Sequence, residues 1–510
     1  MESKLLKTDV CFNKNIFSEV LEQPIDVDFT LPDYCPDISK IFKCRAVPMI
    51  TSKSMNGKSI TIDGNVCITL LYCDKNNKLC SYEYIYPFSK IKEMPEESDD
   101  CNLSCAAKCD YINCRAITGR KVDIHGAVSL KVKAFKRCSN QIVSDYDEEN
   151  LELKRSLAPA TVPIGYREKY LIVEEEISIG NSNAPVLQIL RYDAAPYINE
   201  CKVLNEKIVV KGEMAISVLY SAEGVAVPQL IKTTLPFSQI VEIAGVTELC
   251  KCDVKAKIAF LEVRPANSLG GECRSLTFNA KVCLLCESYC VNEIAVIEDA
   301  FSTKYQTALT QNQVRFNKIC QNVKENCLFK RNVELMEDIS SVIDIWCEKG
   351  SPKVTLANGN INLSALLLVG IIACDQNNNV SFYEKPLEFE FNYPLNCDSD
   401  SLYFNPDIEI LSIGYTILSA NTLEIRIEVC VMGAVYEKSD ISLITDIKID
   451  TTKPCVKAKK GGAVICFLNK DETIWEIAKK YNASTEEIAK INGIEKESLK
   501  DKKIILVPIN

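Results

Sequence analysis

One segment of this 510-residue chain recurs three times, and this repetition constrains the fold more than any other feature of the sequence. The first two copies lie 148 or 149 residues apart, and the third follows about 153 residues later. We therefore divide most of the chain into three copies of one domain, followed by a basic linker and a smaller domain. The copies, in order, begin at Ile60 with ITIDGNVCITLLYC, at Ile208 with IVVKGEMAISVLYS and at Ile361 with INLSALLLVGIIAC. The predicted boundaries are 10–155, 165–315 and 325–450 for the copies, 451–463 for the linker and 464–510 for the last domain.

Each copy has the residue pattern of antiparallel β-structure. Apolar and polar residues alternate along 60–70, which is the period of a strand with one buried face. The Asp/Asn-rich stretches 73–78 and 374–379 each separate two such runs and predict hairpin turns, because Asn and Asp tolerate positive φ. Asn56-Gly57 predicts another turn. The chain is thus predicted to be mainly β, with three tandem antiparallel β-sandwich or barrel-like domains.

Two further expectations concern the segments between these strands. Asp37–Phe42 and its equivalents look like a short helical turn. Linkers between the copies are expected at Leu157–Gly165 and near Asn312–Asn326.

The last domain has a different period. A strand at 464–468 precedes Glu472–Tyr481, whose apolar residues recur at the spacing of one helical face. A second helix is expected to begin at Ser484 with Glu487 completing a capping box, and to end at Asn492-Gly493. A strand at 504–507 follows. The order βααβ predicts a small α+β domain.

This segment resembles the LysM domain over ETIWEIAKKYNASTEEIAKINGI and the terminal IILVP. LysM modules commonly bind N-acetylglucosamine polymers outside the membrane. Asp471 and Lys502 occupy two positions where the family usually has glycine, near its binding loops, so we expect a protein partner here. Trp475 lies about 100° around the helix from Ile474, on the flank of the apolar face. It is either a rim residue that covers the small core or a contact anchor of the kind found at interface hot spots. The expected partner-binding residues are Asn469, Lys470, Asp471, Glu472, Trp475, Asn492, Gly493 and Ile494.

The motif LPDYCPDISKI, from Leu31 to Ile41, is followed by a long hairpin that ends in YPFS, and this combination resembles the SPOCS (DUF3794-type) repeat of endospore-forming bacteria. Three such repeats followed by a LysM domain resemble a family of spore coat morphogenesis proteins. The resemblance implies a non-enzymatic adaptor in the mother-cell cytoplasm, at the forespore surface and in the spore coat. It also implies that the LysM domain binds a SpoIVA-like coat-base ATPase, and we expect the repeats to contact other spore coat proteins. The alternative is a peptidoglycan- or N-acetylglucosamine-binding protein of the cell wall or spore envelope.

Charge and hydropathy narrow the classes of partner. The formal net charge of −10 disfavours nucleic-acid binding, which needs a basic surface. The longest apolar run, 365–374, is half the length that a membrane-spanning helix needs, so any membrane association would be peripheral and mediated by partners. No secretory signal is visible, so the 26 cysteines are expected to be reduced thiols.

No catalytic or metal-binding constellation emerges from the residue types. The one histidine, His125, lies in an alternating strand pattern and is expected to be a structural or surface residue. Cys101, Cys105 and Cys109 could converge but are one ligand short of a closed zinc site. Cys283 and Cys286 should face opposite sides of a strand. We therefore expect no catalytic residue, no metal and no cofactor.

Overall fold

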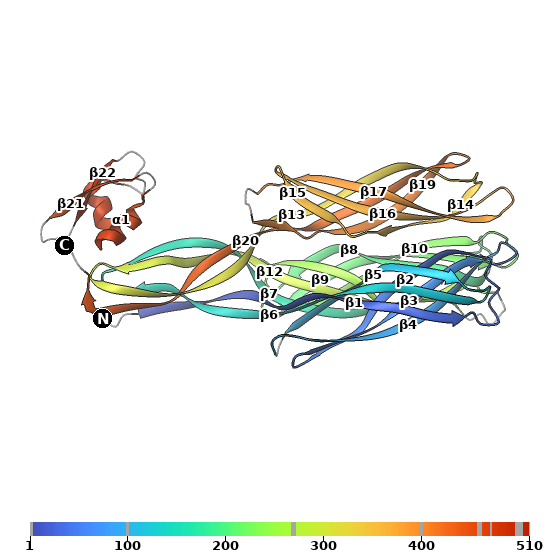
Figure 1. The fold of residues 1–510 in the computed structure, drawn as a ribbon, viewed down its shortest axis with the longest axis horizontal. Helices are drawn as coiled ribbons and strands as arrows, with labels where there is room; N and C mark the ends of the chain where they lie inside the picture. Colours follow the sequence, from blue (N-terminus) through green and yellow to red (C-terminus); the bar gives the residue numbers. More distant parts are fainter. Residues whose placement is uncertain are drawn as a thin grey trace.

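The computed structural model describes residues 4–97, 101–266, 272–397, 401–455, 462–469, 472–494 and 503–508. Its architecture confirms the predicted mainly β fold with a small βααβ domain (Figure 1). Three sets of strands follow one another along the chain. The first set comprises β1 (Lys4–Thr30), β2 (Lys40–Asn56), β3 (Ser59–Cys73), β4 (Leu79–Glu93), β5 (Asn102–Ala116) and β6 (Lys121–Asp147). The second comprises β7 (Leu151–Ser178), β8 (Val186–Leu204), β9 (Lys207–Ala222), β10 (Gln229–Glu242), β11 (Lys251–Pro265) and β12 (Ser275–Ser302). The third comprises β13 (Tyr305–Glu334), β14 (Ser341–Lys349), β15 (Lys353–Ala357), β16 (Asn360–Cys374), β17 (Val380–Pro394), β18 (Leu402–Phe404), β19 (Asp407–Ser419) and β20 (Thr422–Pro454).

Each set repeats the same order of antiparallel pairing. In the first set, sheet β1–β6–β5 and sheet β2–β3–β4 pack face to face around one apolar core. The second set pairs as β7–β12–β11 and β8–β9–β10 around its own core. In the third set, β14 and β15 together occupy the place of one long strand beside β16, and β18 and β19 do the same beside β20. The three sets are therefore three β-sandwiches.

Alternating side chains build these cores, as the sequence predicts. Along β3, Ile60, Ile62, Val66 and Ile68 are at most 1% exposed, while the alternate residues Thr61, Asp63, Asn65 and Cys67 are only partly buried. One buried face on each sheet is what lets two sheets share a core.

The predicted hairpin turns are present. The carboxylate of Asp74 accepts hydrogen bonds of 2.8 Å from the backbone N–H groups of Asn76 and Lys78, and Asn77 adopts a φ of 61°. The turn at 375–379 repeats both bonds and the positive φ. The predicted turn at Asn56-Gly57 joins β2 to β3, with Gly57 at a φ of 58°.

The predicted helical turn at Asp37–Phe42 is wrong. Residues 37–39 form no helix, and β2 begins at Lys40. The backbone N–H of Ile38 donates to Gly119 O at 2.7 Å and that of Ser39 to Cys73 O at 2.8 Å. Because these amides bind distant segments, they are not available for helical bonds to the preceding turn.

The predicted linkers at Leu157–Gly165 and Asn312–Asn326 are also wrong, because both segments lie inside long strands, β7 and β13. The long strands pair as β1 with β6, β7 with β12 and β13 with β20. Each pair continues beyond its sandwich as a two-stranded ribbon, and Figure 1 shows the ribbons extending together toward the end where the N-terminus lies.

The ribbons pack on one another through equivalent positions. Two small apolar clusters join them, and each contains a set of equivalent residues from β6, β12 and β20. These residues are Ile142, Val296 and Leu443 in one cluster and Val143, Ile297 and Ile444 in the other. A ladder irregularity follows these positions in each ribbon, so the ribbons share a local twist as well as a contact. The three ribbons thus form one stalk with approximate three-fold symmetry.

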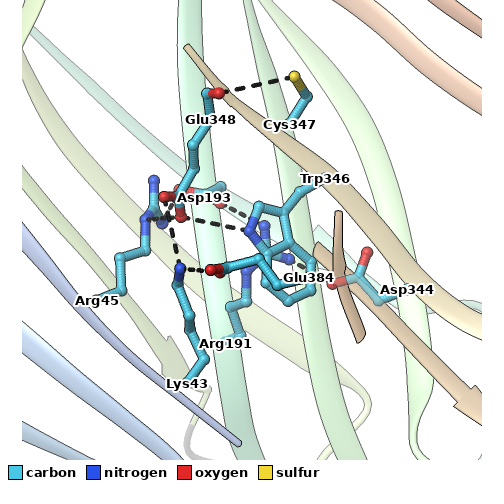
Figure 2. A network of polar contacts seen from close by, with 9 residues as sticks. All are labelled: Lys43, Arg45, Arg191, Asp193, Asp344, Trp346, Cys347, Glu348 and Glu384. Atoms are coloured by element: carbon cyan, nitrogen blue, oxygen red, sulfur yellow. Dashed lines mark hydrogen bonds and ion pairs between the residues drawn. The ribbon is translucent and has the colours of Figure 1, made fainter. Parts of the chain in front are cut away.

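The sandwiches themselves meet through a buried network of charged side chains (Figure 2). Arg191 of the second set, 7% exposed, bonds to Asp344 of the third set, and its guanidinium lies 4.1 Å from the ring centre of Trp346. Asp193 accepts at 2.5 Å from both Arg191 and Arg45, the latter from the first set. Burial raises the pKa of Asp193, but the guanidinium groups of Arg45 and Arg191 outweigh it and hold that pKa below its ordinary value. Side chains from all three sets thus hold the sandwiches together.

Candidate partner-binding site

The C-terminal domain folds around a small core. It consists of β21 (Ala463–Phe467), α1 (Ile474–Tyr481), α2 (Thr485–Asn492) and β22 (Ile504–Pro508), with β21 antiparallel to β22. Its core residues are Cys466, Ile474, Ile477, Ala478, Ala483, Ile488, Ile505 and Val507. The predicted capping box at Ser484 is wrong, since Ser484 makes no side-chain capping bond. The capping box belongs to α1, where Thr473 and Glu476 bond reciprocally.

Two of the predicted contact residues before α1, Asn469 and Glu472, bond to each other. The Glu472 carboxylate accepts from the backbone N–H of Asn469 at 3.0 Å and from its side-chain amide at 3.3 Å. Asn469 is exposed and Glu472 is partly buried. Lys470 and Asp471, also predicted to contact a partner, lie outside the described residues.

The predicted contact residues after α2 hold the domain together. Asn492 bonds to the backbone of Leu506 twice, as donor at 2.6 Å and as acceptor at 2.8 Å, and so ties α2 to β22. Gly493 ends α2 with a φ of 59°, a left-handed conformation that favours glycine. Ile494 packs against the small core. Asn492, Gly493 and Ile494 therefore have structural roles in the domain, while Asn469 and Gly493 are also exposed at its surface.

Trp475 contacts another part of the same chain. Its ring meets that of Phe301 edge to face, with ring centres 5.0 Å apart, and its indole N–H donates to Asp299 at 2.9 Å. Lys479 forms an ion pair with the same carboxylate at 2.6 Å. Phe301 and Asp299 lie on β12, at the far end of the second ribbon. Trp475 therefore packs against the small core as a rim residue would, and it also fastens the C-terminal domain to the stalk.

A second face of the domain was missed by the sequence reasoning. Four large apolar side chains point outward from the two-stranded sheet β21–β22, where Ile465 is paired with Leu506 and Phe467 with Ile504. Their exposed fractions are 60% for Ile465, 40% for Leu506, 72% for Phe467 and 48% for Ile504. We call these four residues the β21–β22 face. Its signal was present in the sequence, because strands as apolar as AVICF and IILVP in a single two-stranded sheet can bury only one side.

The other residues considered from the sequence for catalysis or metal binding lie outside the C-terminal domain. His125 is on β6, 57% exposed, with its ring nitrogens 3.2 Å from Asp26 and Asp123. Among the described residues, no three His, Cys, Asp or Glu side chains are grouped so as to hold a metal ion. Within the same residues, no helix is long and apolar enough to cross a membrane.

The expectation of reduced thiols throughout needs one correction. Cys250 and Cys290 form a disulfide, with Cα atoms 4.6 Å apart, and none of the other 24 cysteines, all within the described residues, is in a disulfide. The pairing follows from strand register, because Lys251 on β11 lies opposite Tyr289 on β12 and brings their neighbours together.

Comparison with known families agrees with this geometry. A model described as SipL, SPOCS domain matches residues 37–117 and 185–265, and a LysM domain model matches residues 469–508. The chain thus carries two SPOCS domains, 148 residues apart, and a C-terminal LysM domain. Both are non-catalytic domain types, and together they indicate a sporulation-related adaptor or a cell-wall-binding protein. No curated protein and no solved structure matches the chain significantly.

Proposed function

We propose that this chain, with its two SPOCS domains and its LysM domain, is a non-enzymatic adaptor in endospore coat assembly. The third set of strands is a third SPOCS-like repeat, which its order of strand pairing supports. We place the protein in the mother cell, at the forespore surface and in the spore coat. The LysM domain binds a coat-base ATPase of the SpoIVA type, and the repeats bind coat or forespore-surface components.

The exposed β21–β22 face is the observation that supports this proposal most directly. Its four exposed side chains are apolar, and such a patch on so small a domain suits a protein surface. A saccharide needs hydrogen-bonding groups aimed at its hydroxyls, and the four apolar side chains of the β21–β22 face do not supply them. Asn469 closely follows this face along the chain, and the backbone N–H of Leu468 donates to Lys503 O at 3.0 Å beside Ile504. We therefore place the partner on the β21–β22 face and on the neighbouring Asn469 and Glu472.

In this proposal, Trp475 contacts the stalk in the free protein and the partner in the complex. A partner that contacts Trp475 must displace Phe301 and Asp299 of the stalk, so binding and release of the LysM domain are coupled. Glycan binding through the LysM domain is the second candidate, and the family match itself favours it. Exposed Phe467 could then stack on a sugar ring.

Pull-down of a purified SpoIVA-type ATPase by the full-length chain tests the proposal. We expect Phe467→Glu and Trp475→Glu each to abolish capture while circular dichroism shows a folded protein. Tyr111→Glu, which changes an exposed aromatic residue on β5 outside the cavity lining, is the matched control and should capture normally. Normal capture by both LysM variants would refute the proposed surface. Saturable sedimentation with peptidoglycan, competed by chitooligomers, together with no capture of the ATPase would favour the glycan candidate.

A further inference from the structure

A large cavity lies where the three sandwiches meet. It has a volume of about 1000 Å³ and takes its lining from all three sets of strands. This volume is at the upper end for sites that hold small ligands, about 300–1000 Å³. A space of this size between tightly packed domains is unusual, because protein interiors rarely leave voids larger than a water molecule.

Five of the strands around the cavity present their edges to it. β2, β5, β8, β11 and β19 lie at the edges of their sheets or beside a central strand, and consecutive residues of each line the cavity. The runs on these five strands are 47–50, 105–107, 191–197, 256–259 and 409–413. Consecutive residues 215–217 of the central strand β9, 232–234 of β10 and 345–347 of β14 line the cavity as well, so its walls are strand edges and parts of sheet faces.

Short side chains in the walls leave the cavity unfilled. Short side chains recur at the lining, among them Ala106 of the first set and Ala195 of the second. Neither belongs to the sandwich core of its own set, in contrast to the neighbouring Ala107 and Ala194. Larger side chains at 106 and 195 would therefore occupy the cavity.

An added peptide strand is not the occupant that these walls favour. Pro48 and Pro196 stand at equivalent positions of β2 and β8, and both line the cavity. Proline has no N–H to donate, so neither edge offers a continuous ladder to an extended peptide. A small molecule fits the space better.

The charge of the lining points to an anion. Six basic and four acidic side chains line the cavity, although the whole chain carries a net charge of −10. Most of the basic groups are paired, as Lys53 is with Glu168 and Lys349 is with Asp407. Lys257 lines the cavity and, within the described part of the chain, makes no ion pair or side-chain hydrogen bond. Lys232, the other lining lysine that makes no ion pair among the residues the structure describes, belongs to the second set as well. Burial, and then the nearby charge of Lys255, lower the pKa of Lys257, and Asp407 opposes them only in part, so an anion beside Lys257 would stabilise its charged form.

Apolar side chains also line the cavity. Ile258 and Leu261 lie on the same strand as Lys257, and Ile345 and Ile410 come from the third set. We propose that the cavity binds an amphipathic monoanion, with its acidic group beside Lys257 and its hydrocarbon part against these residues. Such a ligand satisfies the unpaired ammonium group and buries apolar surface at the same time.

Calorimetric titration of the full-length chain with dodecanoate and dodecylammonium tests this site. We expect one dodecanoate per chain and at least tenfold weaker binding of dodecylammonium, which has the same tail and the opposite charge. Lys257→Met should weaken dodecanoate binding at least fivefold, because it keeps the aliphatic stem and removes the charge. Lys251→Met, at an exposed position on the same strand outside the cavity, should leave the affinity unchanged.

Filling the cavity provides the second arm of the test. Ala195→Trp should abolish dodecanoate binding, and Ala106→Trp, on a different sandwich, repeats the test if the first variant does not fold by circular dichroism. The proposal is overturned if the native chain does not bind dodecanoate or binds both amphiphiles equally. It is likewise overturned if Lys257→Met or a folded cavity-filling variant retains native affinity.

Discussion

The contact between the LysM domain and the stalk predicts that Asp299 controls where this domain lies. Asp299→Ala removes the acceptor of the Trp475 indole N–H and the partner of Lys479. A hydrogen bond to a charged acceptor contributes about 1.5–3 kcal/mol. The ion pair adds at most about 1 kcal/mol, because the Lys479 side chain is 48% exposed. A loss of about 2–3 kcal/mol would shift the docking equilibrium toward the released domain by about 30- to 150-fold.

Fluorine NMR of the chain labelled with 5-fluorotryptophan measures this shift directly. The protein has two tryptophans, Trp346 and Trp475, so two resonances are expected and Trp475→Phe assigns them. In Asp299→Ala, the Trp475 resonance should move toward its position in a solvent-exposed environment, while the Trp346 resonance stays in place. The LysM core should remain folded, because Asp299 lies outside it.

The approximate three-fold symmetry of the stalk supplies a matched control. Asp446 occupies the position on β20 that Asp299 occupies on β12, two residues after the shared apolar cluster residue, but it makes no contact with the LysM domain among the described residues. Asp446→Ala should leave both resonances unchanged. If Asp299→Ala gives the same spectrum as Asp446→Ala, the contact does not hold the domain and the reasoning is refuted.

Three further predictions concern stability, each measured by thermal unfolding. Asp344→Ala leaves the buried Arg191 without one of its two carboxylates and should cost about 3–5 kcal/mol, whereas Lys121→Ala, which breaks an exposed pair with Asp28, should cost at most about 1 kcal/mol. Gly212→Ala should cost about 1–3 kcal/mol, since a Cβ there would lie 2.5 Å from Phe237 Cζ, while Gly414→Ala meets open space and should not. Cys290→Ser should cost about 2–4 kcal/mol in non-reducing buffer and little under reduction, in contrast to Cys201→Ser at an exposed free thiol. An equal effect of any variant and its control would contradict the corresponding argument.

The elements that the sequence predicted well are those fixed by local chemistry. The alternation along β3 and the Asp-rich turns at 74–78 and 375–379 need no distant partner, and both are present as expected. The βααβ order follows from the helical spacing of the apolar residues in the same way. Errors occurred where backbone groups bind distant segments, as at Ile38, or where strands continue past a sandwich, as at 157–165.

The candidate site shows the same division. The flank position of Trp475 was predictable from helix geometry, but its contact with Phe301 joins segments 174 residues apart and depends on how the ribbons pack. The network around Arg191 and Asp193 was not recognisable either, because each of its ion pairs with Arg45 or Asp344 crosses between repeats. The β21–β22 face could have been predicted, because these two strands carry more apolar side chains than one small core can bury.

The stalk separates the LysM domain from the sandwiches. Beyond the last pairing of β5 with β6, at Phe135, about twelve residues of β6 continue in the first ribbon alone, which is a distance of about 40 Å at 3.3 Å per residue. The LysM domain sits at the tip of this extension and the hairpin turns of the sandwiches lie away from it (Figure 1). Proteins held at the tip and at the sandwiches would therefore occupy different layers, and the length of the ribbons would set the spacing between those layers.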